Sequence, residues 1–92
     1  MRAVWNGAVI ANGNTVTLEG NHYFPPDALV QEHLRLSDHT STCPWKGEAG
    51  YFDVVVGGQT NPNAAWIYRD PKPAASEIEG HVAFWKGVEV VD

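Results

Sequence analysis

The sequence predicts a mostly β domain of the α+β class: a small curled antiparallel sheet or open barrel with one main helix. Three observations support this prediction: short runs of alternating or β-branched residues, tight-turn signals between those runs, and one stretch with helical spacing of its apolar residues. Nine glycines and six prolines favour short elements joined by turns. The length of 92 residues is that of one domain, so residues 1–92 are expected to form a single unit.

The first part of the chain predicts hairpins. Asn6-Gly7 separates two short, largely apolar runs, and Asn-Gly suits a type I′ turn because both central residues of that turn need a positive φ. A second turn at residues 12–14 leads to the β-branched run 15–19. Residues 21–24 are expected to pair with that run or to form an edge strand.

One substantial helix is predicted over residues 26–36. The segment opens with Pro-Pro-Asp at residues 25–27, where proline suits the first helical turn and the acid suits the positive end of the helix dipole. Its mainly apolar positions recur at spacings of three and four, which places them on one helical stripe. The residues of this stripe are Leu29, Val30, His33 and Leu34.

The rest of the chain is predicted to alternate strands with turns. Residues 39–48 are expected to form a loop, and residues 73–79 to form one or two helical turns that end at Gly80. A Gly-Gly pair at residues 57–58 predicts a turn between two strands. The predicted strands of this half are residues 50–56, 64–69, 81–85 and 88–91.

The charge and the cysteine content exclude several classes of partner and site. The net charge is −5, and the six Lys and Arg residues are scattered along the chain, so we expect no nucleic-acid partner. One cysteine excludes an internal disulfide and a zinc site built on several cysteines. No apolar run is long enough to cross a bilayer, and the N-terminus lacks the apolar core of a signal peptide. We therefore expect a cytoplasmic protein without membrane contact.

A resemblance to a known family is carried by residues 40–52, TSTCPWKGEAGYF. Shorter pieces occur in the same order along the chain: VWNG, YFPP, AAWIYRDP and GHVAFW. Together they make the whole chain resemble the domain of unknown function family numbered 427. The resemblance implies a small, mainly β, soluble domain found singly or in tandem, and some catalogues label the family a nucleotidyltransferase domain.

The residues themselves do not favour nucleotidyl transfer. That reaction normally uses carboxylates gathered around divalent metal ions, commonly with an Asp-x-Asp pair on a strand. The sequence contains no Asp-x-Asp and no glycine-rich phosphate loop before a helix. Its four histidines are widely separated, and Pro44 opposes a helix that would align His39 with Cys43. We expect no metal ligands and no cofactor.

A catalytic site is one interpretation of residues 39–46. Cys43 is a candidate nucleophile, with His39 as its acid or base and the positive charge of Lys46 lowering the pKa of the thiol. Lys46 is itself a candidate catalytic residue. The opposing interpretation is that Cys43 is a small buried residue, since a free cysteine is often buried and inert.

An aromatic ligand pocket is the favoured interpretation. Aromatic residues come from three separate segments, and if the strands of Tyr51 and Trp66 pair across residues 57–58, their aromatic faces meet. Rings as walls with a few charged groups describe a small-molecule pocket, although large rings also build the core of a small β domain. The aromatic set is Trp45, Tyr51, Trp66, Tyr68 and Trp85. The predicted ligand-binding residues are Trp45, Glu48, Tyr51, Trp66, Tyr68 and Arg69.

Three functions stay open. The leading one is binding of an unidentified small molecule in a pocket at the Cys-Pro-Trp-Lys-Gly loop, residues 43–47. The second is an enzyme that uses Cys43 or Lys46, with His39 as acid or base. The third is a structural or protein-interaction module, in which Trp45 closes the end of the sheet. Formation of a homo-oligomer is compatible with each of them.

Overall fold

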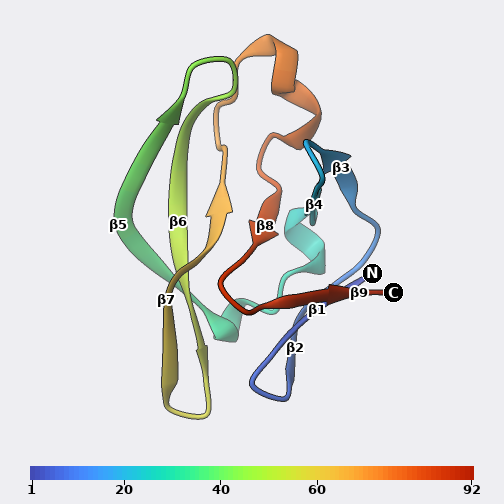
Figure 1. The fold of residues 1–92 in the computed structure, drawn as a ribbon, viewed down its shortest axis with the longest axis vertical. Helices are drawn as coiled ribbons and strands as arrows, with labels where there is room; N and C mark the ends of the chain where they lie inside the picture. Colours follow the sequence, from blue (N-terminus) through green and yellow to red (C-terminus); the bar gives the residue numbers. More distant parts are fainter.

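The computed structural model describes residues 1–92 and contains nine strands in three antiparallel sheets, none of which closes into a barrel. The largest sheet has four strands in the order β5-β6-β7-β8 (Figure 1). Neighbouring strands of this sheet follow one another in the chain, so it is a simple meander. Its strands are β5 (Leu34–Cys43), β6 (Gly47–Val56), β7 (Gln59–Ile67) and β8 (Val82–Phe84).

Two smaller sheets complete the fold. A three-stranded sheet has the order β2-β1-β9, so the first and last strands pair and the two termini lie close together (Figure 1). The two-stranded sheet β3-β4 is tied to β8 by a bridge between Phe24 and Val82. The strands are β1 (Arg2–Trp5), β2 (Ala8–Asn12), β3 (Val16–Leu18), β4 (Asn21–Tyr23) and β9 (Glu89–Val91).

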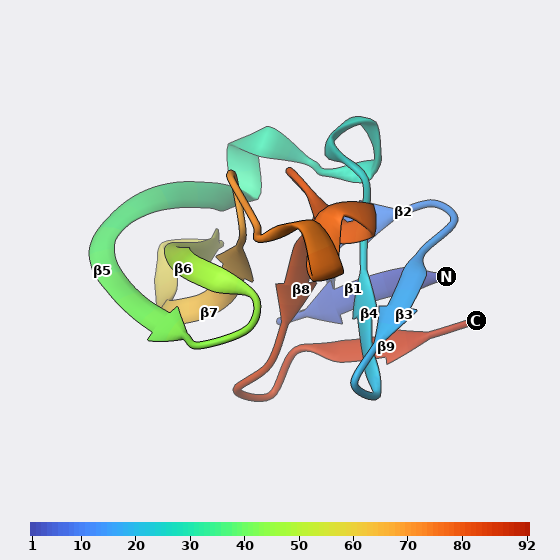
Figure 2. The same ribbon diagram turned by 90° about the horizontal axis from the view of Figure 1, so that it is seen from above.

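Strand β5 curves strongly around β6 and β7 (Figure 2). Leu36 pairs with Phe52 and Thr40 pairs with Gly50, so residues 37–39 lie opposite a single residue of β6. Extra residues on one strand of an antiparallel pair bend that strand and increase its twist. This bulge therefore accounts for the bend of β5.

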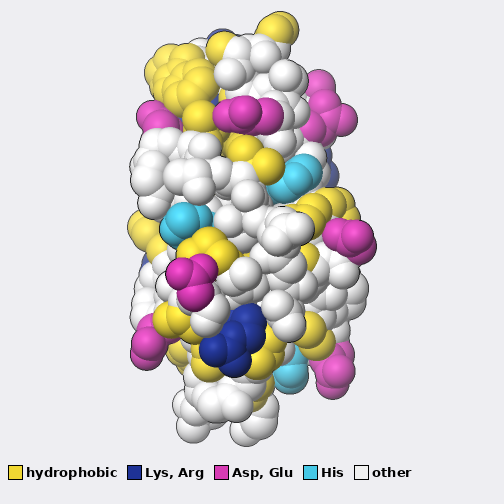
Figure 3. Space-filling model, turned by 90° about the vertical axis from the view of Figure 1, so that its right-hand side faces the viewer, with side chains coloured by type: hydrophobic (Ala, Val, Ile, Leu, Met, Phe, Trp, Pro, Cys, Tyr) yellow, Lys and Arg dark blue, Asp and Glu magenta, His cyan; other side chains and the backbone are white.

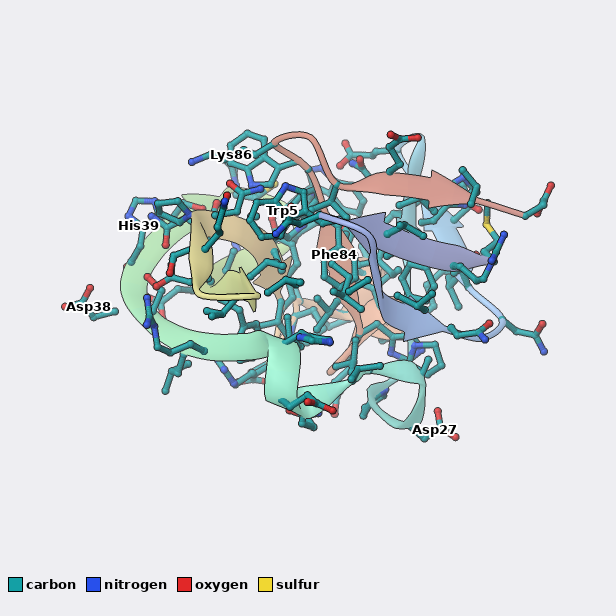
Figure 4. All side chains as sticks on the ribbon, turned by 90° about the horizontal axis from the view of Figure 1, so that it is seen from below. Trp5, Asp27, Asp38, His39, Phe84 and Lys86 are labelled. Atoms are coloured by element: carbon teal, nitrogen blue, oxygen red, sulfur yellow. The ribbon has the colours of Figure 1, made fainter.

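The core consists of two clusters of buried side chains. The first lies between the large sheet and strands β1 and β2, and it includes Ile10, Phe24 and Val54. Figure 4 shows Trp5 and Phe84 pointing into the interior, whereas Asp27 and Asp38 point away from it. The second cluster lies toward η3 (Pro73–Ile78) and contains Tyr23, Ala49, Tyr68, Ala75, Ile78 and Ala83.

Several predictions from the sequence are confirmed. The domain is mostly β with antiparallel sheets, and the turn at Asn6-Gly7 has φ values of 51° and 78°, as a type I′ turn requires. The predicted helical turns at residues 73–79 are the 3₁₀ segment η3. None of the helical segments is long and apolar enough to cross a membrane.

The predicted main helix over residues 26–36 is wrong. Two 3₁₀ turns, η1 (Pro26–Ala28) and η2 (Gln31–His33), take its place, and β5 begins at Leu34. Between the turns, the Val30 N–H donates to the Ile10 carbonyl at 3.0 Å. The bonds within the segment join residues three apart, as from the Leu29 N–H to the Pro26 carbonyl, so the segment forms 3₁₀ turns and no α-helix. The spacing of three and four arises from two successive turns followed by a strand.

The predicted loop over residues 39–48 is also wrong. Strand β5 continues to Cys43, residues 44–46 form the turn, and β6 begins at Gly47. Residues 40–43 pair in register with residues 47–50 of β6. This part of β5 is a solvent-exposed edge strand with polar side chains on both faces, so it shows no alternation of apolar and polar residues.

The assignment of β2 to the core predicts a contrast between adjacent residues. Ile10 is fully buried, whereas the Val9 residue is 38% exposed. We expect Ile10→Ala to lower the free energy of unfolding by about 2–5 kcal/mol, because it leaves a cavity in the first cluster. Val9→Ala, the matched control, should change it by less than about 1 kcal/mol. Urea unfolding measures both, and equal losses would contradict the packing of β2 described here.

Candidate functional site

An aromatic hollow of about 190 Å³ opens on one face of the large sheet. Tyr51 on β6 and Trp66 on β7 are direct register partners, so their side chains emerge side by side on this face. This confirms the predicted pairing across residues 57–58. The remaining walls come from the turn before β6 and from the segments that follow β7 and β8. We call this site the aromatic hollow; it is lined by Lys46, Tyr51, Trp66, Tyr68 and Trp85.

The indole rings of the hollow are held by hydrogen bonds to residues outside its lining. The Trp66 Nε1–H donates to the Tyr23 hydroxyl at 3.1 Å, and the Trp85 Nε1–H donates to the Asn63 carbonyl at 2.6 Å. The Trp66 ring also packs edge-on against Tyr23 and Trp85, with ring centroids 6.1 and 5.8 Å away. Because both indole donors already have partners, these rings offer mainly apolar surface to the hollow.

Lys46 lies at one end of the hollow with only 9% of the residue exposed. Its ammonium forms an ion pair with Glu19 from the tip of the β3–β4 hairpin. Glu19 has a φ of 53°, a region that residues other than glycine rarely adopt. This turn conformation brings the Glu19 carboxylate to Lys46 and so joins two hairpins that are distant in the sequence.

The protonation of Lys46 follows from its surroundings. Burial alone lowers the pKa of Lys46, but the hydrogen bond to Glu19, the phenols of Tyr23 and Tyr68 and the charge of Glu19 together raise it above its ordinary value. Lys46 is therefore an ammonium at neutral pH. An ammonium donates hydrogen bonds and is not a nucleophile.

Tyr68 is the second hydrogen-bond donor of the hollow. Burial raises the pKa of Tyr68 more than the nearby Lys46 charge lowers it, so the phenol is protonated at neutral pH. The Tyr51 hydroxyl bonds to Ser41 and the Tyr23 hydroxyl to Trp66, whereas the Tyr68 hydroxyl has no partner in the protein. No buried side-chain oxygen lacks a partner, so this hydroxyl is open to solvent.

His39 and Cys43 are not brought together. His39 lies in the bulge of β5, on the outer side of the curved strand (Figure 4). Its ring centroid is 4.6 Å from that of Tyr51. Cys43 is half-buried at the other end of the strand, where it packs against the second core cluster. Four residues of extended strand span about 13 Å, which is beyond hydrogen-bond reach.

The predicted ligand-binding residues divide into three groups. Tyr51, Trp66 and Tyr68 line the aromatic hollow, as does the catalytic candidate Lys46. Trp45 lies on the turn before β6, is 39% exposed and is not a lining residue, although the Lys46 ammonium is 5.4 Å from its ring centroid. The last group consists of Glu48 and Arg69, which line a separate polar hollow.

The structure adds two residues to the predicted site, one in the lining of the aromatic hollow and one that pairs with Lys46. Trp85 belongs to the aromatic set found in the sequence, and the structure adds it to the walls. Glu19 pairs with Lys46, but the only signal in the sequence is its place before Gly20 in a turn. A long-range ion pair such as this has no pattern in the sequence, because it joins residues 27 positions apart.

The His, Cys, Asp and Glu side chains do not form a metal centre. No three of the His, Cys, Asp and Glu side chains come together in an arrangement that could hold a metal ion. Figure 3 shows acidic side chains scattered over one face of the molecule and no gathering of Lys and Arg on that face. The residues therefore do not fit a nucleotidyl-transfer centre built on divalent metal.

The paired donors Lys46 and Tyr68 predict a loss of stability in alkali. Both pKa values are higher in the folded chain than their ordinary values of 10.5 and 10.0, so the folded state keeps these protons to higher pH than the unfolded state. Their contribution is complete below about pH 10 and is lost as the pH rises through the folded pKa values.

The double variant Lys46→Met/Tyr68→Phe should therefore show a flatter decline of the unfolding free energy above pH 10 than the parent. Lys86→Met, which removes an exposed lysine outside the hollow, is the control and should keep the parental slope. Urea unfolding at a series of pH values measures the slopes. A double variant as steep as the parent would contradict the assignment.

Comparison with known proteins gives a match to a family model that covers the whole chain. No curated protein matches it. A family model matches residues 1–92; it carries the label NTP_transf_9 and the description domain of unknown function (DUF427). This confirms the resemblance carried by residues 40–52 and by the shorter pieces around them. The chain therefore belongs, over its full length, to the DUF427 family of domains of unknown function.

Proposed function

We propose that this domain binds a small, flat, uncharged molecule in the aromatic hollow, with a carbonyl oxygen of the ligand placed against Lys46 and Tyr68. The observation that carries this proposal is that two protonated donors, Lys46 and Tyr68, line a hollow whose other walls are aromatic rings, with the Lys46 ammonium 5.5 Å from the centroid of the Tyr68 ring. Binding sites of this kind combine apolar walls with a few placed polar groups.

The size of the hollow supports a small ligand. The volume of the hollow is about 190 Å³. It lies below the range of about 300–1,000 Å³ that is usual for larger ligands. One ring with a short polar substituent fits this space. A flat ring can also stack against Trp66 and Trp85, whose faces need no further hydrogen bond.

The charges support an uncharged ligand. Lys46 has three N–H donors and uses one on Glu19, so it can still donate to a ligand oxygen. Glu19 already neutralises its charge, and a ligand carboxylate would be repelled by Glu19. A carbonyl oxygen accepts from Lys46 and from the free Tyr68 hydroxyl without this penalty.

The protonation states support binding over catalysis in this hollow. Lys46 and Tyr68 both hold their protons at neutral pH, so neither offers a free base. His39 and Cys43 lie at opposite ends of the exposed part of β5 and do not form a nucleophile–base pair.

Benzamide is a suitable probe, and its binding can be followed by shifts of backbone amide signals in NMR. Tyr68→Phe keeps the ring and removes the hydroxyl, so it should weaken binding about three- to tenfold. Trp85→Leu removes an exposed wall and should weaken binding by a similar factor. Trp45→Leu is the matched control, because Trp45 is exposed but lies outside the lining. It should leave the affinity unchanged.

Replacing Glu19 tests the role of charge. Benzoate should bind the parent no better than benzamide, and Glu19→Gln should improve benzoate binding several-fold because the Lys46 charge is no longer compensated. Absence of saturable benzamide binding to the parent would overturn the proposal. An equal loss in Trp45→Leu and Trp85→Leu would place the ligand at the turn instead of in the hollow.

A further inference from the structure

A second hollow, of about 260 Å³, lies on the opposite face of β6 and has no hydrophobic residue in its lining. Gly50 is adjacent to Tyr51 in the strand, and successive side chains of a strand point to opposite faces. The two hollows lie on opposite faces of β6, and their linings share no residue. We call this one the polar hollow; it is lined by Thr40, Glu48, Gly50, Arg69 and Asp70.

Arg69 is held in place in the polar hollow but has no acidic partner. Its guanidinium lies over the Phe52 ring, with 5.6 Å from Cζ to the ring centroid. It also lies against the backbone of Gly50. No side-chain hydrogen bond or ion pair of the protein involves the guanidinium, since the two ion pairs are elsewhere. A guanidinium with free donors suits a carboxylate, which it can bind through two parallel hydrogen bonds.

The absence of a side chain at Gly50 leaves room for the Arg69 guanidinium. A Cβ at this position would lie 2.6 Å from Nη1 of Arg69, closer than side-chain contacts allow. Gly50 does not have a positive φ, so its backbone conformation does not demand glycine. Glycine weakens the interior of a strand and often marks a close approach by another group. The glycine here leaves space for Arg69.

The two carboxylates of the polar hollow determine what else the ligand carries. Glu48 and Asp70 are exposed and form no ion pair in the protein. With Arg69 they give the hollow one positive and two negative groups. The two carboxylates repel a polyphosphate, and Arg69 weakens the attraction of the hollow for a simple cation. A ligand with a carboxylate and an ammonium on the same carbon atom offers each of these three groups a partner of opposite charge, and the Thr40 hydroxyl can donate or accept beside them.

We propose that the polar hollow binds a short zwitterion of the α-amino acid class, with its carboxylate on Arg69 and its ammonium between Glu48 and Asp70. The ligand's own side chain would extend toward solvent, because the lining residues are largely exposed. This site is independent of the aromatic hollow and of the function proposed for it.

L-Alanine is the probe, and the amide signals of the polar hollow in NMR provide the readout. Alanine should give saturable shifts at residues 48–50 and 69–70. Acetate supplies only the anion and methylammonium only the cation, so each should bind at least about threefold more weakly than alanine. Inorganic phosphate should give no saturable shift at these residues. Benzamide should leave them unchanged, which separates this test from that of the aromatic hollow.

Three variants test the geometry. Arg69→Gln should weaken alanine binding about tenfold, the usual effect of losing a charge-assisted hydrogen bond. Gly50→Ala keeps the charge but displaces the flexible guanidinium, so it should also weaken binding several-fold, with a thermal midpoint close to that of the parent. Arg35→Gln removes an equal charge from an exposed ion pair outside the polar hollow and should leave binding unchanged.

Three outcomes would overturn the proposal. One is the absence of saturable alanine shifts in the parent protein. A second is acetate binding as tightly as alanine, which would leave no role for Glu48 and Asp70. The third is an equal loss in Arg35→Gln and Arg69→Gln, which would indicate a general charge effect instead of a site.

Discussion

The register of β6 against its two neighbours is the constraint on which both hollows depend. β6 pairs with β5 on one side and β7 on the other, and Tyr51 stands opposite Trp66. Since successive side chains of a strand point to opposite faces, this register places Tyr51 on the aromatic face and Gly50 on the polar face. A slip by one residue would exchange the faces and dismantle both sites together.

The ion pair between Lys46 and Glu19 is the second organising interaction. It joins the turn before β6 to the tip of the β3–β4 hairpin and holds Lys46, which lines the aromatic hollow. Removing a lysine charge from water is costly, and a carboxylate partner offsets much of that cost. Glu19 reaches Lys46 from a backbone conformation that is unfavourable for a residue other than glycine. Glu19 and Gly20 share this conformation with Asn6 and Gly7, because each pair forms a tight hairpin turn that needs a positive φ at both residues.

The predictions that succeeded depended on local chemistry. Asn6-Gly7 could be assigned to a turn because few dipeptides accept positive φ at both positions. Tyr51 and Trp66 could be paired because a Gly-Gly turn joins their strands.

The prediction of a main helix failed because the apolar spacing over residues 29–34 suits both a helix and two tight turns against β2. The exposed half of β5 was not predicted as a strand, because its polar residues show no alternation of apolar and polar side chains. Its strand conformation depends on pairing with β6.

The sequence alone determined the family, the mostly β class, the hairpin turns and an aromatic set, four of whose five residues line the hollow. These follow from residue identity and short-range spacing, which the chain carries in every conformation. Only the tertiary structure decided that Glu48 and Arg69 lie apart from the aromatic residues and that Glu19 pairs with Lys46. These relations depend on strand register and on a bulge that bends β5, and both are set by packing between distant segments.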